Sequence, residues 1–174
     1  MRASITIFFL IMSLLLVGQS NIKNDCCALI DPNYKGDVVI YDNPNGNIVK
    51  ILRHSISEEG EYYLALSIFN DSLGFFYVAI GLLSSDKKEI KGWIKKINYI
   101  GTYTRNYSST LNLYDSPSLK SKKRSTIPGG EDCFAIIDSC YKKWVLVRIK
   151  NKGKIKKGWI EPDMQCCNPY TNCC

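Results

Sequence analysis

Few residues in this chain could carry out catalysis. His54 is the only histidine, and it stands in a polar stretch. A catalytic histidine needs a nucleophile or a carboxylate beside it in space, and the setting of His54 is typical of an exposed loop. The carboxylates Glu58, Glu59 and Glu61 could in principle cleave a glycosidic bond, but their polar surroundings offer nothing that would keep one of them protonated. We therefore predict that the chain is not an enzyme and needs no cofactor.

The N-terminus determines the redox environment of the other reactive side chains. Arg2 gives a positive start, residues 5–17 are almost wholly apolar, and small residues follow at 18–20. This pattern is typical of a cleaved secretory signal over residues 1–20, and the apolar run is shorter than the roughly 20 residues of a membrane span. We expect a periplasmic or secreted protein without a transmembrane segment after cleavage. An uncleaved anchor is the alternative.

Cysteines supply the second kind of chemistry. All of them lie beyond residue 20: Cys26, Cys27, Cys133, Cys140, Cys166, Cys167, Cys173 and Cys174. An even number in an exported chain is typical of disulfides. Zinc sites are the alternative, but they usually use Cys-x-x-Cys spacing, which adjacent pairs lack, so we predict no metal site. We expect the tail to be tied back either to the first doublet or to Cys133 and Cys140.

Positive charge is concentrated in the second half of the chain. Residues 26–98 hold 8 basic and 9 acidic side chains, whereas residues 99–165 hold 13 basic and 6 acidic ones. Such asymmetry indicates that the second half meets an anionic partner. Lys154 and Lys156 are candidate contacts, and they share a face with Lys150 and Lys152 only if the intervening turn preserves the alternation of side chains. Solvated hairpin tips are the alternative.

The elements that must position these residues occur as two copies of one small unit. Lys-Gly-Trp-Ile stands at residues 91–94 and again at 157–160, and Tyr-Asp-x-Pro precedes it at 41–44 and 114–117. Before each ending lies an apolar strand-like run, residues 75–80 and 144–149, followed by a polar tip at 84–89 and 151–154. This order is typical of β-hairpins. Because no amphipathic helix of more than one or two turns is evident, we predict an all-β fold.

The ordered set of words resembles the bacterial SH3-like (SH3b) repeat over residues 31–96 and 103–163. The resemblance implies two small, partly open β-barrels in tandem, used as binding modules in cell-envelope proteins. We divide the chain into a signal peptide (1–20), copy one with its lead-in (21–98), copy two (99–163) and a Cys-rich tail (164–174). The lead-in over 21–33 is expected to be irregular, and residues 98–106 are expected to bridge the copies as a short linker.

The resemblance also suggests where a ligand would bind. Ligands of such barrels tend to meet aromatic residues near the first loop and the rim, which points to Tyr41 and Tyr114. Trp144 leads a strand beside a turn, with Tyr141 nearby, and aromatic side chains offer a large rigid contact area. Trp93 and Trp159 recur at the same place in both copies, which favours a packing role for them.

Together these features predict an exported, non-catalytic binding module that recognises cell-wall peptide or glycan. The expected partner is peptidoglycan or another anionic envelope polymer. Nucleic acid is not expected, because the signal peptide removes the chain from the cytoplasm. The alternative is an envelope protein that docks another protein or has a structural role, stapled by disulfides.

Overall fold

The computed structural model of the protein describes residues 24–53, 56–57, 60–61, 63–72, 74–82, 89–105, 109–130 and 133–167. The predicted signal peptide, His54, Glu58, Glu59, Cys173 and Cys174 lie outside the described residues. Only the backbone of Glu61 is described.

Within the described residues the chain is built from strands, and the predicted all-β class is confirmed. The only helical element there is the 3-10 helix η1 (Pro162–Met164), and no helix in this part of the chain is long and apolar enough to cross a membrane. The strands are β1 (Cys26–Ile30), β2 (Asp37–Tyr41), β3 (Ile48–Arg53), β4 (Ile56–Ser57), β5 (Gly60–Glu61), β6 (Leu64–Ser72), β7 (Phe75–Leu82), β8 (Ile90–Lys95), β9 (Ile100–Thr104), β10 (Leu111–Tyr114), β11 (Lys123–Ile127), β12 (Phe134–Tyr141), β13 (Trp144–Asn151), β14 (Lys154–Ile160) and β15 (Gln165–Cys166).

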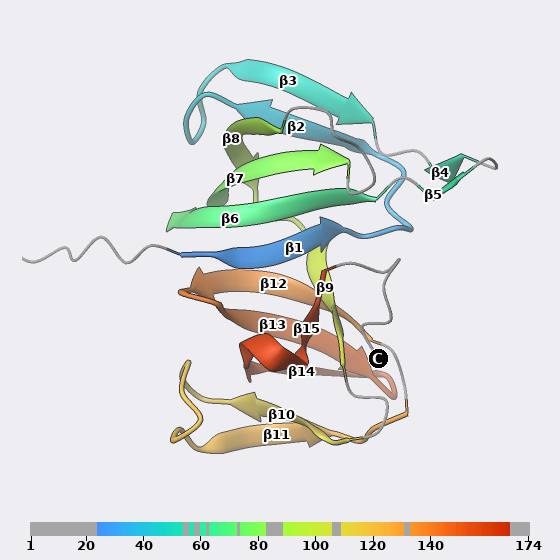
Figure 1. Ribbon diagram of the computed structural model, residues 1–174, viewed down its shortest axis with the longest axis vertical. Helices are drawn as coiled ribbons and strands as arrows, with labels where there is room; N and C mark the ends of the chain where they lie inside the picture. The colour runs from blue at the N-terminus through green and yellow to red at the C-terminus, as the bar shows by residue number, and fades with distance from the viewer. Residues whose placement is uncertain are drawn as a thin grey trace, which may run out of the picture.

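The two copies have the same strand order. Copy one runs β1-β6-β7-β8-β2-β3 and copy two runs β9-β12-β13-β14-β10-β11, and antiparallel pairing of β1 with β9 joins them into one sheet. This sheet follows the long axis of the molecule, with β3 at one end and β11 at the other (Figure 1). The pairing path through the described strands is open at both ends, so the sheet is not closed into a barrel.

The lead-in, which was predicted to be irregular, and the predicted linker form the seam between the copies. The lead-in contains β1, in which Ala28, Leu29 and Ile30 are fully buried, and the expected linker contains β9. The prediction of an irregular lead-in was therefore wrong, and the linker between the copies is itself a strand. The two strands form their hydrogen bonds with segments that are far away in the chain. In β9, moreover, two of the buried side chains are polar, Thr102 and Thr104, so the strand lacks a clear pattern of apolar residues.

The glycine of each Lys-Gly-Trp-Ile motif permits a close crossing of two strands. A Cβ atom on Gly92 would lie 2.4 Å from Ile40 Cγ2, and one on Gly158 would lie 2.8 Å from Leu113 Cβ. A glycine is therefore needed at both positions for the two backbones to approach this closely. At this crossing Trp93 stands opposite Tyr41, and Trp159 stands opposite Tyr114. In each copy the Lys-Gly-Trp-Ile motif is therefore the structural partner of the Tyr-Asp-x-Pro motif.

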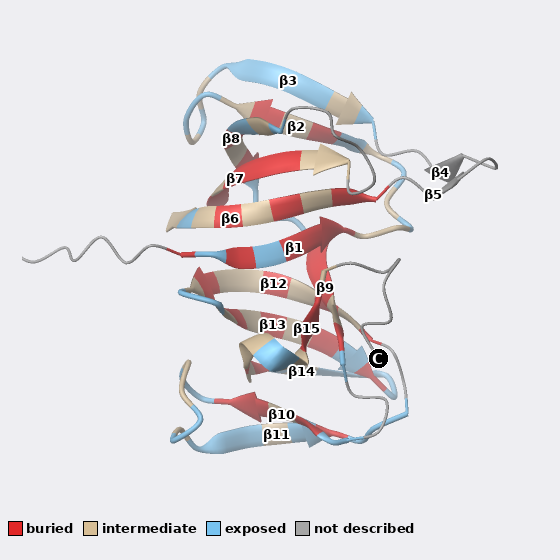
Figure 2. Cartoon of the chain, viewed as in Figure 1, coloured by how far each residue is buried: buried red, intermediate tan, exposed pale blue. Residues whose placement is uncertain are grey.

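A single apolar core runs through both copies. Buried side chains from β1, β6 and β7 are continuous with those of β9, β12 and β13, and Figure 2 shows the buried segments concentrated in the middle strands. Fully buried members include Ile68 and Phe76 from copy one and Ile137 and Val147 from copy two. Each copy therefore shares its core with the other.

Candidate functional site

Each copy contains one edge-to-face aromatic pair at the same position. The ring centroids of Tyr114 and Trp144 are 5.7 Å apart with an interplanar angle of 82°. Those of Tyr41 and Phe75 are 6.0 Å apart at 89°. This arrangement is one of the favoured geometries for aromatic rings, so the tyrosine of each Tyr-Asp-x-Pro word has a packing role.

The two tyrosines differ in how much surface they leave for a ligand. Tyr114 is only 4 % exposed, whereas Tyr41 is half-buried. Burial raises the pKa of Tyr114, and the charge of Glu161 raises it further, while a hydrogen bond from Asn112 acts in the opposite direction. A ligand can therefore touch little of Tyr114 itself, although it can touch the residues that cover it.

A half-exposed apolar surface lies beside this pair. Tyr141 stands opposite Trp144 across the β12–β13 turn, and Leu146 stands opposite Trp159. All four side chains are half-buried, and on β13 they alternate with the buried Val145. We call Tyr141, Trp144, Leu146 and Trp159 the aromatic face of copy two. It brings together two of the predicted binding residues, Tyr141 and Trp144, and adds Leu146, which the sequence did not single out.

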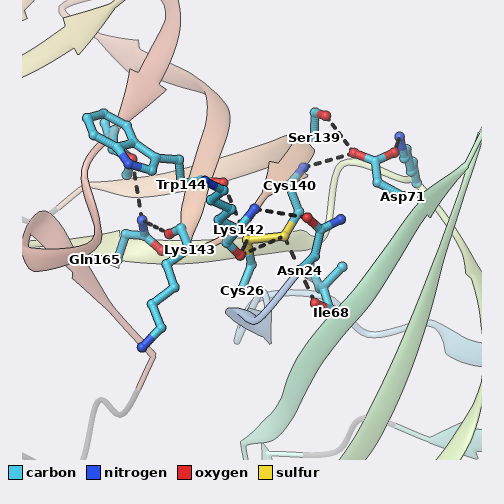
Figure 3. Close-up of a disulfide and its surroundings, with 12 residues drawn as sticks. Asn24, Cys26, Ile68, Asp71, Ser139, Cys140, Lys142, Lys143, Trp144 and Gln165 are labelled. Carbon is cyan, nitrogen blue, oxygen red and sulfur yellow. Dashed lines mark hydrogen bonds and ion pairs between the residues drawn. A yellow bond between two sulfur atoms is a disulfide. The ribbon is translucent and has the colours of Figure 1, made fainter. Parts of the chain in front are cut away.

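The turn beneath this surface is held in place by the N-terminal segment (Figure 3). Lys142 adopts a left-handed backbone conformation with φ of 56°, which is uncommon for a residue other than glycine. Its N–H donates to Asn24 Oδ1 over 2.9 Å, and its carbonyl accepts from the N–H of Asp25 over 2.7 Å. The Lys142 ammonium group lies 5.7 Å from the centroid of the Tyr141 ring. A positive charge therefore stands directly at the aromatic face.

The predicted basic residues do not gather on one side. Lys154 stands opposite Asn151 and Lys156 opposite Ile149, on the face that carries the buried Val147. The side chain of Lys150 belongs to the other face, because the turn between β13 and β14 shifts the alternation. The condition for a single lysine face is therefore not met, and Lys154 and Lys156 lie across the sheet from the aromatic face.

Lys156 already has a partner. Its Nζ donates to the carbonyl oxygen of Thr126 on β11 over 2.5 Å. Lys154 is exposed at the end of β14. Of the two predicted lysines, Lys154 is therefore the one whose charge faces solvent.

An acidic residue that sequence reasoning missed neutralises part of copy two. Asp138 accepts from Arg148 Nε over 2.8 Å, and Lys157 Nζ lies 2.7 Å from its other oxygen. Burial alone would raise the pKa of Asp138, but hydrogen bonds from Lys157 and Arg148, with their positive charges, hold it below its ordinary value. Asp138 stands at a break in the register of β12, which periodicity cannot locate.

The first cysteine doublet ties the two copies together, a link that the sequence analysis did not predict. Cys26 of β1 bonds to Cys140 of β12, with Cα atoms 6.2 Å apart. Beside this disulfide, Asp71 of copy one accepts from Ser139 Oγ over 2.5 Å and from the N–H of Cys140 over 2.8 Å (Figure 3). Asp71 also forms an ion pair with Lys96. Covalent and polar contacts therefore cross the seam at one point.

The second disulfide ties back the tail. Cys27 bonds to Cys167, which confirms the expected link from the tail to the first doublet. Cys166 is also disulfide-bonded, and Cys133 is buried. No group of three or more potential metal ligands occurs among the described residues.

Comparisons with known proteins do not identify a family. No protein-family model matches the chain, and no curated protein matches its sequence. Among solved structures, NlpC1 from Trichomonas vaginalis aligns with 87 % of this chain at 20 % identity and a TM-score of 0.34. NlpC2 from the same organism aligns with 80 % at 20 % identity and a TM-score of 0.31. The chain spans about half the length of each of these structures, 49 % and 47 %.

Proposed function

We propose that this protein is an exported, non-catalytic binding protein made of two tandem SH3-like modules, and that it recognises cell-wall peptide or glycan. The aromatic face of copy two carries the proposal. It offers two tryptophans and a tyrosine that are neither fully buried nor fully exposed. Such side chains present rigid apolar area that can stack on sugar rings or peptide groups.

The charges near this face favour an anionic ligand. Lys142 and Lys143 are exposed at the adjoining turn, and the backbone contacts with Asn24 and Asp25 fix where that turn lies. Arg148 and Lys157 contribute less, because Asp138 pairs with both. Carboxylates or phosphates of an envelope polymer would therefore meet the turn lysines first.

The disulfides support an exported location. The two pairs whose partners are described, Cys26–Cys140 and Cys27–Cys167, join segments 114 and 140 residues apart. Bonds of this kind form and persist in oxidising compartments. This agrees with the signal peptide predicted over residues 1–20.

The test compares one half-buried tyrosine from each copy. Binding of the oxidised chain to purified peptidoglycan is measured by co-sedimentation for Tyr141→Ala and for Tyr77→Ala, which is packed beside Trp93 in copy one. We expect Tyr141→Ala to weaken binding about tenfold, as for a residue at the centre of an interface. Tyr77→Ala should bind as the wild type does, and thermal unfolding should show that both variants fold. Equal affinity for Tyr141→Ala and the wild type would reject this site.

A further inference from the structure

The free edge of copy one is an apolar strand. β3 ends the sheet (Figure 1), and its Ile48, Val49 and Ile51 are 58 %, 54 % and 49 % exposed. Figure 2 shows the strand exposed over most of its length. An exposed apolar edge presents unpaired N–H and C=O groups together with apolar side chains, which makes it a template for pairing with another chain.

Copy two shows that the fold does not require these apolar residues. Ile48 stands opposite Tyr41 just as Lys123 stands opposite Tyr114. The same alignment continues along both strands. The exposed residues Ile48, Val49 and Ile51 of β3 therefore correspond, in that order, to Lys123, Arg124 and Thr126 of β11. Both strands even have their register break at the same place. Packing inside the unit therefore does not explain the three apolar side chains.

The other end of the sheet is protected against pairing. β11 carries exposed charges at Lys123 and Arg124, and Lys156 occupies the carbonyl oxygen of Thr126. Charged side chains on an edge strand are a common device against unwanted pairing. The other end, β3, also has two exposed charges, Lys50 and Arg53, but unlike β11 it exposes three large apolar side chains beside them.

We propose that β3 binds a second copy of this chain, with the two β3 strands antiparallel about a twofold axis. The chain already joins its own two copies by antiparallel pairing of β1 and β9. Charge permits the same contact at β3, because residues 26–98 carry 8 basic and 9 acidic side chains. The basic second halves would lie at the far ends of the pair, since β11 is at the opposite end of the molecule (Figure 1).

The charges of β3 also disfavour one register of this pairing and permit another. Pairing centred on Ile51 places Lys50 opposite Leu52 and Val49 opposite Arg53, so that no like charges face each other. Pairing centred on Lys50 would place the two lysines opposite each other, which is destabilising. A contact of one short strand is smaller than the roughly 1,600 Å² of a standard interface, so association should be weak. This inference does not depend on the ligand proposed above.

Analytical ultracentrifugation of the oxidised chain, at concentrations up to about 1 mM, tests the interface. The edge variant Ile48→Lys/Val49→Arg/Ile51→Thr carries the residues that copy two holds at the same positions. The control variant, Leu119→Lys/Ile155→Lys, removes two other exposed apolar side chains. We expect wild type and control to form a non-covalent dimer, and the edge variant to dimerise at least tenfold more weakly. A wild-type chain that stays monomeric would overturn the proposal and indicate that a different protein binds β3. A dimer whose affinity is unchanged in the edge variant would overturn it as well.

Cross-linking tests the register. Under mild oxidation Ile51→Cys should form a covalent dimer, with the new disulfide mapped between the two substituted positions by mass spectrometry. Ile155→Cys is the control, because Ile155 is 71 % exposed but lies on β14. This variant should not form a covalent dimer. A cross-link that forms equally well at both positions would contradict a specific β3 interface.

Discussion

The Nζ atom of Lys157 lies 2.7 Å from the carboxylate of Asp138. The equivalent lysine of copy one, Lys91, lies instead over the ring of Phe69, 5.9 Å from its centroid. Phe69 and Asp138 stand at the same break in register of β6 and β12. The motif lysine therefore contacts an aromatic ring in copy one and a carboxylate in copy two, although both partners come from the same position of the repeated unit. This difference reduces the free positive charge of copy two.

The ion pairs of Asp138 should make stability fall at low pH. Because its pKa is lowered in the folded chain, the contribution of Asp138 is present above its unfolded pKa, at about pH 4. The contribution is lost as the pH falls through the lower folded value. Urea unfolding between about pH 2 and pH 6 should therefore show a smaller loss of free energy for Asp138→Asn than for the wild type. At neutral pH the variant should be less stable by about 1 kcal/mol.

Asp115→Asn provides the control for Asp138→Asn. Asp115 also has an arginine partner, Arg124, but the two groups are 3.9 Å apart and largely exposed. Such pairs contribute little, so the variant should follow the pH profile of the wild type. If Asp138→Asn and Asp115→Asn gave the same profile, the role assigned to Asp138 would be wrong.

The Cys26–Cys140 disulfide should contribute strongly to stability. It joins residues 114 apart. With Cys27–Cys167 intact, the loop that it adds runs through that second bond and is shorter, yet closing it still restricts the unfolded chain. Both cysteines are buried, so alanine is the substitution that leaves no polar group behind. Cys26→Ala/Cys140→Ala should lose about 2–5 kcal/mol in denaturant unfolding. A loss below about 1 kcal/mol would contradict this and indicate that the other contacts across the seam suffice without the disulfide.

The glycine before each motif tryptophan should tolerate no side chain. In Gly92→Ala and Gly158→Ala the new methyl group would overlap Ile40 and Leu113, respectively. We expect each variant to lose about 1–3 kcal/mol, as for an overpacked core. Gly81→Ala is a matched control on strand β7, because its nearest neighbour would be at an ordinary 3.5 Å. Comparable losses for all three variants would show that strand propensity, not the crossing, decides the cost.

The sequence allowed much of the fold to be predicted, because the repeated words mark fixed points of the unit. Trp93 and Trp159 each stand opposite the tyrosine of the preceding word, so both motifs belong to one local crossing. Strands β1 and β9 escaped prediction because their partners are distant in the chain. The buried hydroxyl of Thr102, for instance, donates over 3.0 Å to the carbonyl oxygen of Cys166, which is 64 residues away in the chain.

The candidate site was predictable only in part, for a similar reason. Aromatic residue type and strand position pointed to Tyr141 and Trp144, which do lie together. The lysines were expected on one face only if the turn between β13 and β14 preserved the alternation of side chains. The turn does not preserve it. Lys152 and Gly153 both have positive φ, 48° and 77°, and the resulting tight hairpin places Asn151 opposite Lys154. Asp138 and Asn24 act through partners that no sequence pattern connects to them.

Sedimentation of the oxidised wild-type chain with purified peptidoglycan, at low and at high salt, tests the proposed binding function most directly. A tube without peptidoglycan corrects for self-association. We predict that the chain co-sediments at low salt and that the bound fraction falls as salt screens the lysines of copy two. Absence of co-sedimentation at low salt would contradict it.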